Sequence, residues 1–75
     1  MYIGIFDRDG NLSERPVVTK ELDVMLFILN AKIDYEPMTE NDRAYVYYLN
    51  NDKMVMVASY DIDENCWLNE NREPI

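Results

Sequence analysis

The first hydrophobic stretch of the chain predicts a strand that enters a turn. Residues 2–6 are mostly β-branched or aromatic, and they stop at residues 7–11, which are typical of turns. Residues 12–18 are the expected returning strand, and Pro16 places that strand at a sheet edge or in irregular structure.

A helix is predicted from the next stretch, where apolar residues recur with helical spacing. Thr19 can cap its N-terminus. One face carries Leu22, Met25, Leu26, Leu29 and Ile33, while other sides carry Val24, Phe27, Ile28 and Ala31. The Leu, Met, Ala and Lys content favours this helix over a strand through residues 24–29. Because the outer side of a surface helix is normally polar, we expect this helix either to be covered on two sides or to contact another chain with its outer stripe.

Two further strands are predicted over residues 43–49 and 54–60, because residues 50–52 between them form a tight-turn signal. Both faces of this hairpin are largely apolar or aromatic, so one face should cover the helix. The other face is a candidate contact surface, or a set of half-exposed tyrosines with hydroxyls in water. Residues 61–65 predict another turn and residues 66–68 a short last strand.

These elements predict one α+β domain over residues 1–75, with an antiparallel sheet of about four strands and one helix packed on a face. Residues 70–75 are expected to be a frayed tail. Hydrophobic residues make up 48% of the chain, which argues against intrinsic disorder. The longest apolar run, residues 24–29, is far short of a membrane span, and no signal peptide is visible, so a cytoplasmic location is expected.

The net charge of −8 is concentrated in two segments. Residues 34–42 hold four acids and no base, and residues 61–73 hold five acids and one base, so the remaining residues sum to zero. An acidic protein is a poor ligand for nucleic acid or an anionic membrane, and we therefore expect neither as a direct partner. Clustered acids can instead bind a basic partner, or they can act only to keep the protein soluble.

Three acidic pairs have the spacing i, i+2, namely Asp34/Glu36, Glu40/Asp42 and Asp61/Asp63. In extended chain each pair would point the same way about 6.6 Å apart, close to two phosphate rises of DNA. The chain is short, acidic and rich in aromatic residues. In these features it resembles the small acidic inhibitors of phages and mobile elements that act as DNA mimics against restriction, CRISPR, repair or nucleoid proteins. The resemblance implies a cytoplasmic inhibitor, not an enzyme, that binds a basic nucleic-acid-binding protein.

The expected interface of such an inhibitor combines carboxylates with aromatic anchors, since aromatic residues dominate binding hot spots. The candidate residues are Asp34, Glu36, Glu40, Asp42, Asp61, Asp63 and Glu64 for the charge, and Tyr47, Tyr48, Tyr60 and Trp67 as anchors. The alternative is a small structural or regulatory subunit that works through apolar contacts. This alternative rests on the outer helix residues and the two-faced hairpin, which could also form a homodimer.

A second resemblance lies in residues 3–12, where a hydrophobic strand leads into Asp7-Arg8-Asp9-Gly10-Asn11. This segment resembles the first motif of the haloacid dehalogenase-type phosphatases, with Asn11 where that family has Thr. The resemblance implies a magnesium-dependent phosphatase with Asp7 as nucleophile and Asp9 as general acid/base. However, 75 residues are too few for the β-α-β units of that family's parallel sheet. A hairpin turn is the simpler interpretation of the motif.

No metal or cofactor site is expected. The chain has no His and a single cysteine, Cys66, which leaves no ordinary zinc site and no internal disulfide. The acidic runs that start at Asp7 and Asp61 lack the Gly and Glu that an EF-hand loop requires at its sixth and twelfth positions. Without His, no Ser/His/Asp set can be assembled.

Overall fold

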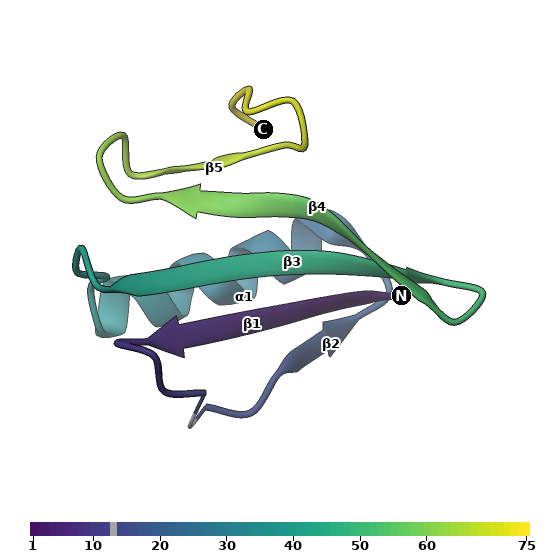
Figure 1. Ribbon diagram of the computed structural model, residues 1–75, viewed down its shortest axis with the longest axis horizontal. Coiled ribbons are helices and arrows are strands. Elements are labelled where there is room, and N and C mark those ends of the chain that lie inside the picture. The colour runs from purple at the N-terminus through teal and green to yellow at the C-terminus, as the bar shows by residue number, and fades with distance from the viewer. Residues whose placement is uncertain (13) are drawn as a thin grey trace.

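The computed structural model describes residues 1–12 and 14–75, and it shows one antiparallel sheet with a single helix on its rear face (Figure 1). The elements in chain order are β1 (Tyr2–Arg8), β2 (Val17–Thr19), α1 (Leu22–Tyr35), β3 (Asp42–Asn50), β4 (Lys53–Asp61) and β5 (Cys66–Leu68). The strand order across the sheet is β2-β1-β3-β4-β5. The predicted α+β class is therefore confirmed, with five strands instead of about four.

Two tight turns connect the strands as their residue types predict. Asp9 and Gly10, which follow β1, have φ angles of 55° and 79°, and the residues on either side of them exchange backbone hydrogen bonds of 2.9 and 3.0 Å. Asn51 and Asp52, between β3 and β4, have φ angles of 47° and 68°. Positive φ at both central residues is the requirement of a type I′ hairpin turn, which Asn, Asp and Gly meet at low cost.

The returning strand is shorter than predicted. Of the expected residues 12–18, Val17 and Val18 pair with β1 directly after Pro16, and the strand continues to Thr19, while Ser13 lies outside the described residues. Thr19 is not the helix cap, because it belongs to β2 and its hydroxyl donates a hydrogen bond of 2.8 Å to the Glu21 carbonyl. The N-cap position is Glu21, which makes no side-chain capping bond.

Helix α1 packs against the middle of the sheet, as predicted. Its buried residues are Met25, Leu29 and Ile33, and the sheet supplies Phe6, Ala44, Val46, Ala58 and Trp67. The approach is closest at Gly4, where an added Cβ would lie 2.7 Å from Met25 Sδ and 3.0 Å from a Leu29 methyl carbon. In the described part of the chain, no helix is both long and apolar enough to cross a membrane.

The C-terminal residues, which the sequence predicts to be a frayed tail, turn back onto β5. The Asn69 side chain accepts hydrogen bonds of 2.9 and 3.0 Å from the backbone N–H groups of Asn71 and Glu73. The Ile75 N–H then donates to the Trp67 carbonyl at 3.0 Å, and Pro74 forms a bridge to β5. The tail thus covers the outer edge of β5.

Candidate acidic interface

Acids from both charged segments gather at one end of the molecule. This acidic end consists of the C-terminus of α1, the loop over residues 36–41, the end of β4 and the turn over residues 62–65, at the left in Figure 1. Its carboxylates are Asp34, Glu36, Glu40, Asp61, Asp63 and Glu64. Glu40, Asp61 and Asp63 border one hollow of about 400 Å³, which Arg43 and Arg72 also border. Asp34 borders a second hollow together with Asn65.

None of the three acidic pairs has the extended geometry that the spacing argument assumed. Asp34 lies in the last turn of α1, so the first pair is not in a strand. Asp61 ends β4, and its carboxylate accepts a hydrogen bond of 3.0 Å from the Asp63 N–H within the following turn. Asp42 of the remaining pair is buried. The acidic end therefore concentrates charge without a row of carboxylates at phosphate spacing.

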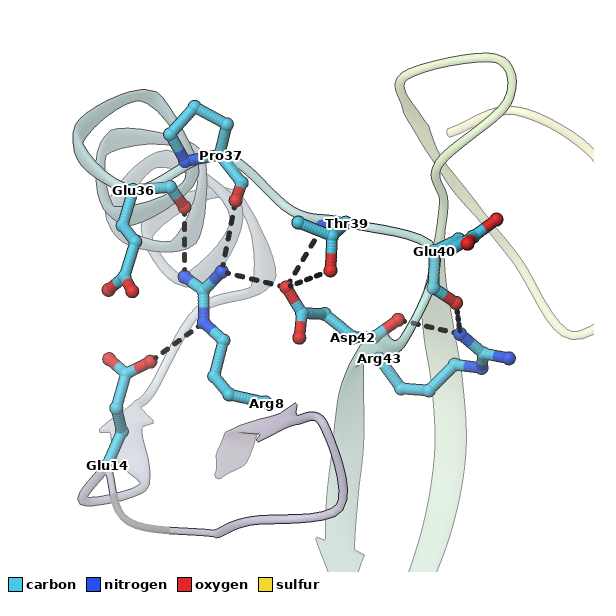
Figure 2. A network of polar contacts seen from close by, with 8 residues as sticks. All are labelled: Arg8, Glu14, Glu36, Pro37, Thr39, Glu40, Asp42 and Arg43. Carbon is cyan, nitrogen blue, oxygen red and sulfur yellow. Dashed lines mark hydrogen bonds and ion pairs between the residues drawn. The ribbon is translucent and has the colours of Figure 1, made fainter.

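A cluster around Arg8 fixes the position of the acidic end, as Figure 2 shows. The guanidinium donates to the Glu36 and Pro37 carbonyls at 3.0 and 3.4 Å, which places a cation on the carbonyl-bearing end of α1. It also forms ion pairs with Glu14 at 3.2 Å and with Asp42 at 3.4 Å. These five residues, which we call the Arg8 network, join β1, α1 and the start of β3.

Asp42 belongs to the structure of this end and not to its exposed surface, so its assignment as a partner-binding residue is corrected. Its relative exposure is 6%, and its carboxylate accepts hydrogen bonds from the Thr39 N–H at 2.9 Å and the Thr39 hydroxyl at 3.1 Å. The Thr39 N–H lowers the pKa of Asp42, and burial acts in the opposite direction. The Thr39 hydroxyl and Arg8 add to the lowering.

Two of the predicted aromatic anchors are part of the core or packed against it. Trp67 is only 5% exposed, and its indole N–H donates to the Asn30 side chain at 2.8 Å. Tyr60 packs edge-on against Trp67 with ring centroids 5.2 Å apart. Burial raises the pKa of Tyr60, and the nearby Cys66 and Asp34 groups add to this effect. Trp67 is therefore unavailable to a partner.

The other two predicted anchors lie on opposite faces of the sheet. Tyr48 faces the helix side and packs against Tyr2 with ring centroids 5.0 Å apart. Tyr47 points to the side without a helix, where its ring centroid lies 6.3 Å from that of Tyr45. Neither tyrosine comes from the elements that form the acidic end.

Sequence reasoning missed the aromatic residue that stands beside the acids. Tyr35, at the C-terminus of α1, is 92% exposed and lies between Asp34 and Glu36. It continues an apolar row on the outside of α1, the outer helix stripe, which consists of Val24, Phe27, Ile28, Ala31 and Tyr35. Phe27 is 77% exposed. The available signal was the helical spacing of Tyr35 after Phe27 and Ala31.

The sheet face opposite α1 is largely apolar, and no helix of the part of the chain that the structure describes packs on it. Residues paired directly across antiparallel strands share a face, so Ile3, Tyr47 and Met56 form one row. The open sheet patch consists of Ile3, Ile5, Tyr45, Tyr47, Leu49 and Met56. The predicted contact face of the hairpin is therefore present, and it extends onto β1.

The phosphatase-like motif stands in a different fold from the one its resemblance implies. Strand β1 has antiparallel neighbours on both sides, and Asp9 belongs to the tight turn. Among residues 1–12 and 14–75, no three acidic or cysteine side chains form a group suited to holding a metal ion. Comparisons of the chain with protein-family models, curated proteins and solved structures give no significant match.

Proposed function

We propose that this protein is a binding module that inhibits or modulates a basic, nucleic-acid-binding protein through its acidic end. The observation that carries the proposal is the convergence of acids from two separate segments at one end of the fold. In a chain whose net charge is −8, this end supplies most of the field that a cationic surface would meet.

Exposed aromatic surface next to the acids supports the same role. Charge complementarity accelerates encounter and sets orientation, whereas desolvated aromatic anchors contribute much of the binding free energy. Tyr35 and Phe27 meet this need better than the buried Trp67, because both are exposed and Tyr35 adjoins Asp34 and Glu36. The proposed interface therefore runs from the acidic end onto the outer helix stripe.

The proposal does not depend on imitation of DNA phosphate spacing. A cluster of carboxylates can occupy a basic groove because each Arg or Lys gains an ion pair, whatever the exact repeat between acids. The expected signature is competition with nucleic acid and a steep loss of affinity with salt.

The test is displacement of a fluorescent DNA duplex from a panel of basic DNA-binding proteins. We expect the wild-type chain to displace the duplex from at least one member at about 50 mM salt and much less at about 200 mM. Asp61→Lys combined with Asp63→Lys should abolish displacement. Glu70→Lys combined with Glu73→Lys changes the net charge equally in the C-terminal tail, and displacement should largely persist. Equal losses in both double variants, or no displacement by the wild type, would refute the proposal.

A further inference from the structure

The open sheet patch is an apolar surface that no helix or strand among the described residues covers. Helix α1 lies on the opposite face of the sheet (Figure 1). The paired residues Ile3 and Tyr47, and Ile5 and Tyr45, are half-buried. The patch continues to the β3–β4 hairpin, where exposure is higher. Met54 and Met56 on this face are 50% and 42% exposed. Large contiguous apolar surface of this kind is uncommon on monomeric proteins.

This surface carries little net charge, in contrast to the rest of the molecule. At the hairpin tip, the charges of Asp52 and Lys53 cancel. Next to the patch, Asp7 and Arg43 lie directly opposite each other on β1 and β3, so they also balance. Glu40, Asp61 and Asp63 lie at the other end of the strands, where they border a hollow that Tyr45 of the patch and the cations Arg43 and Arg72 also line.

The edges of the sheet are poorly suited to adding another strand. Strand β2 has only three residues and follows Pro16, while the tail residues Pro74 and Ile75 occupy the edge of β5. Short or covered edges disfavour edge-to-edge association. If the apolar surface is buried in a complex, packing between sheet faces is the available route.

We propose that a second copy of this chain packs face to face on the open sheet patch, with the two-fold axis across the strands. The acidic end of each copy then lies toward the hairpin end of its partner, and the two acidic ends point in opposite directions. The molecule measures 33 × 28 Å along its two longer axes, and Figure 1 views the sheet along the third. The outline of the whole face is on the order of 900 Å², so a standard interface with roughly 800 Å² from each partner would use most of this face and not only the patch residues.

The outer helix stripe is the competing apolar surface, but its charges suit a different occupant. Asp34 and Glu36 adjoin it at Tyr35, so packing two stripes together would bring acids near acids. A cationic partner would benefit from the same acids. We therefore assign the self-association to the sheet and not to the helix.

Sedimentation velocity from about 1 µM to 1 mM tests the proposal, because this range spans weak and moderate dimers. The wild type should form a dimer, and Met56→Lys should weaken it by at least about 30-fold. Phe27→Lys makes the same charge change on the helix and should leave the dimer intact. Near-ultraviolet circular dichroism and Trp67 fluorescence verify that each variant is folded, and Tyr47→Lys serves as a second patch variant.

The outcomes separate this proposal from the proposed function. A monomer throughout the concentration range would overturn it, as would a dimer that Phe27→Lys disrupts and Met56→Lys preserves. The Asp61→Lys and Asp63→Lys double variant should still dimerise, since its changes lie at the acidic end. If the wild type dimerises but displaces no DNA, the acidic end has been misassigned. If it displaces DNA but does not dimerise, the open sheet patch has been misassigned.

Discussion

Replacement of Arg8 by Met should destabilise the domain more than any other change of a single surface charge that we propose. Met is similar in length and apolar, so it can still cover the Phe6 ring, from which the guanidinium carbon lies 4.9 Å. It cannot pair with Asp42, and it cannot donate to the Glu36 and Pro37 carbonyls at the end of α1.

The magnitude follows from what remains buried. Removing one partner of a buried ion pair typically costs about 3–5 kcal/mol. Here Thr39 still donates two hydrogen bonds to Asp42, and the lost Nη1–Oδ2 contact is long at 3.4 Å, which lowers the expected cost to about 2–3 kcal/mol. A domain of 75 residues has a total stability of about 4–11 kcal/mol. The variant should thus lose a large fraction of its stability, with a fall in Tm of about 8–24 °C.

Urea unfolding followed by the fluorescence of Trp67, the single tryptophan, measures this loss directly. Arg15→Met is the matched control, because Arg15 is exposed and the charge change is identical. The stability of Arg8→Lys should fall between those of the wild type and Arg8→Met. A single Lys ammonium cannot contact all four partners of Arg8, namely Glu14, Glu36, Pro37 and Asp42. If Arg8→Met and Arg15→Met unfold within about 0.5 kcal/mol of each other, the network does not stabilise the fold.

Three further predictions test the packing and the two perturbed groups. Gly4→Ala should cost about 1–3 kcal/mol in urea unfolding, because its Cβ would crowd Met25 Sδ at 2.7 Å; a neutral result would contradict the close approach of α1. Because the pKa of Asp42 is lowered in the folded state, its ionised form contributes stability that is complete above the unfolded pKa of about 3.9. This stability is lost as pH falls through the folded pKa. Asp42→Asn should therefore flatten the acid side of a plot of Tm against pH. The raised pKa of Tyr60 contributes stability that is complete below about pH 10 and is lost as pH rises through the folded value. Tyr60→Phe should therefore resist alkaline unfolding better than wild type, and an unchanged alkaline limb would count against the burial of this hydroxyl.

Local signals in the sequence were sufficient for the elements but not for their contacts. The helix follows from the 3.6-residue repeat and the β3–β4 turn from Asn51 and Asp52, because each depends on residues close together in the chain. The predicted cap at Thr19 was wrong because pairing with β1 keeps that residue in a strand. Tertiary pairing in this case overrode a local preference.

The acidic end shows the same limit more strongly. Arg8 acts through Glu36, Pro37 and Asp42, which are 28 to 34 positions away, so no local pattern could identify it. The aromatic pattern likewise did not reveal that Trp67 faces the core with Asn30 as its partner, whereas Tyr35 is exposed. The charge pattern located the acids in residues 34–42 and 61–73, but only the fold shows that acids from both segments lie at one end.

The two proposed surfaces should respond to salt in opposite ways, which follows from where the charge lies. Contacts between the acidic end and a basic partner weaken as ions screen them, over a Debye length of about 8 Å at physiological ionic strength. Packing on the open sheet patch buries apolar side chains between copies that each carry −8, so screening reduces their mutual repulsion. Raising the salt concentration should therefore release the partner and preserve or strengthen the dimer. A dimer that dissociates along with the partner would show that both associations use the acidic end.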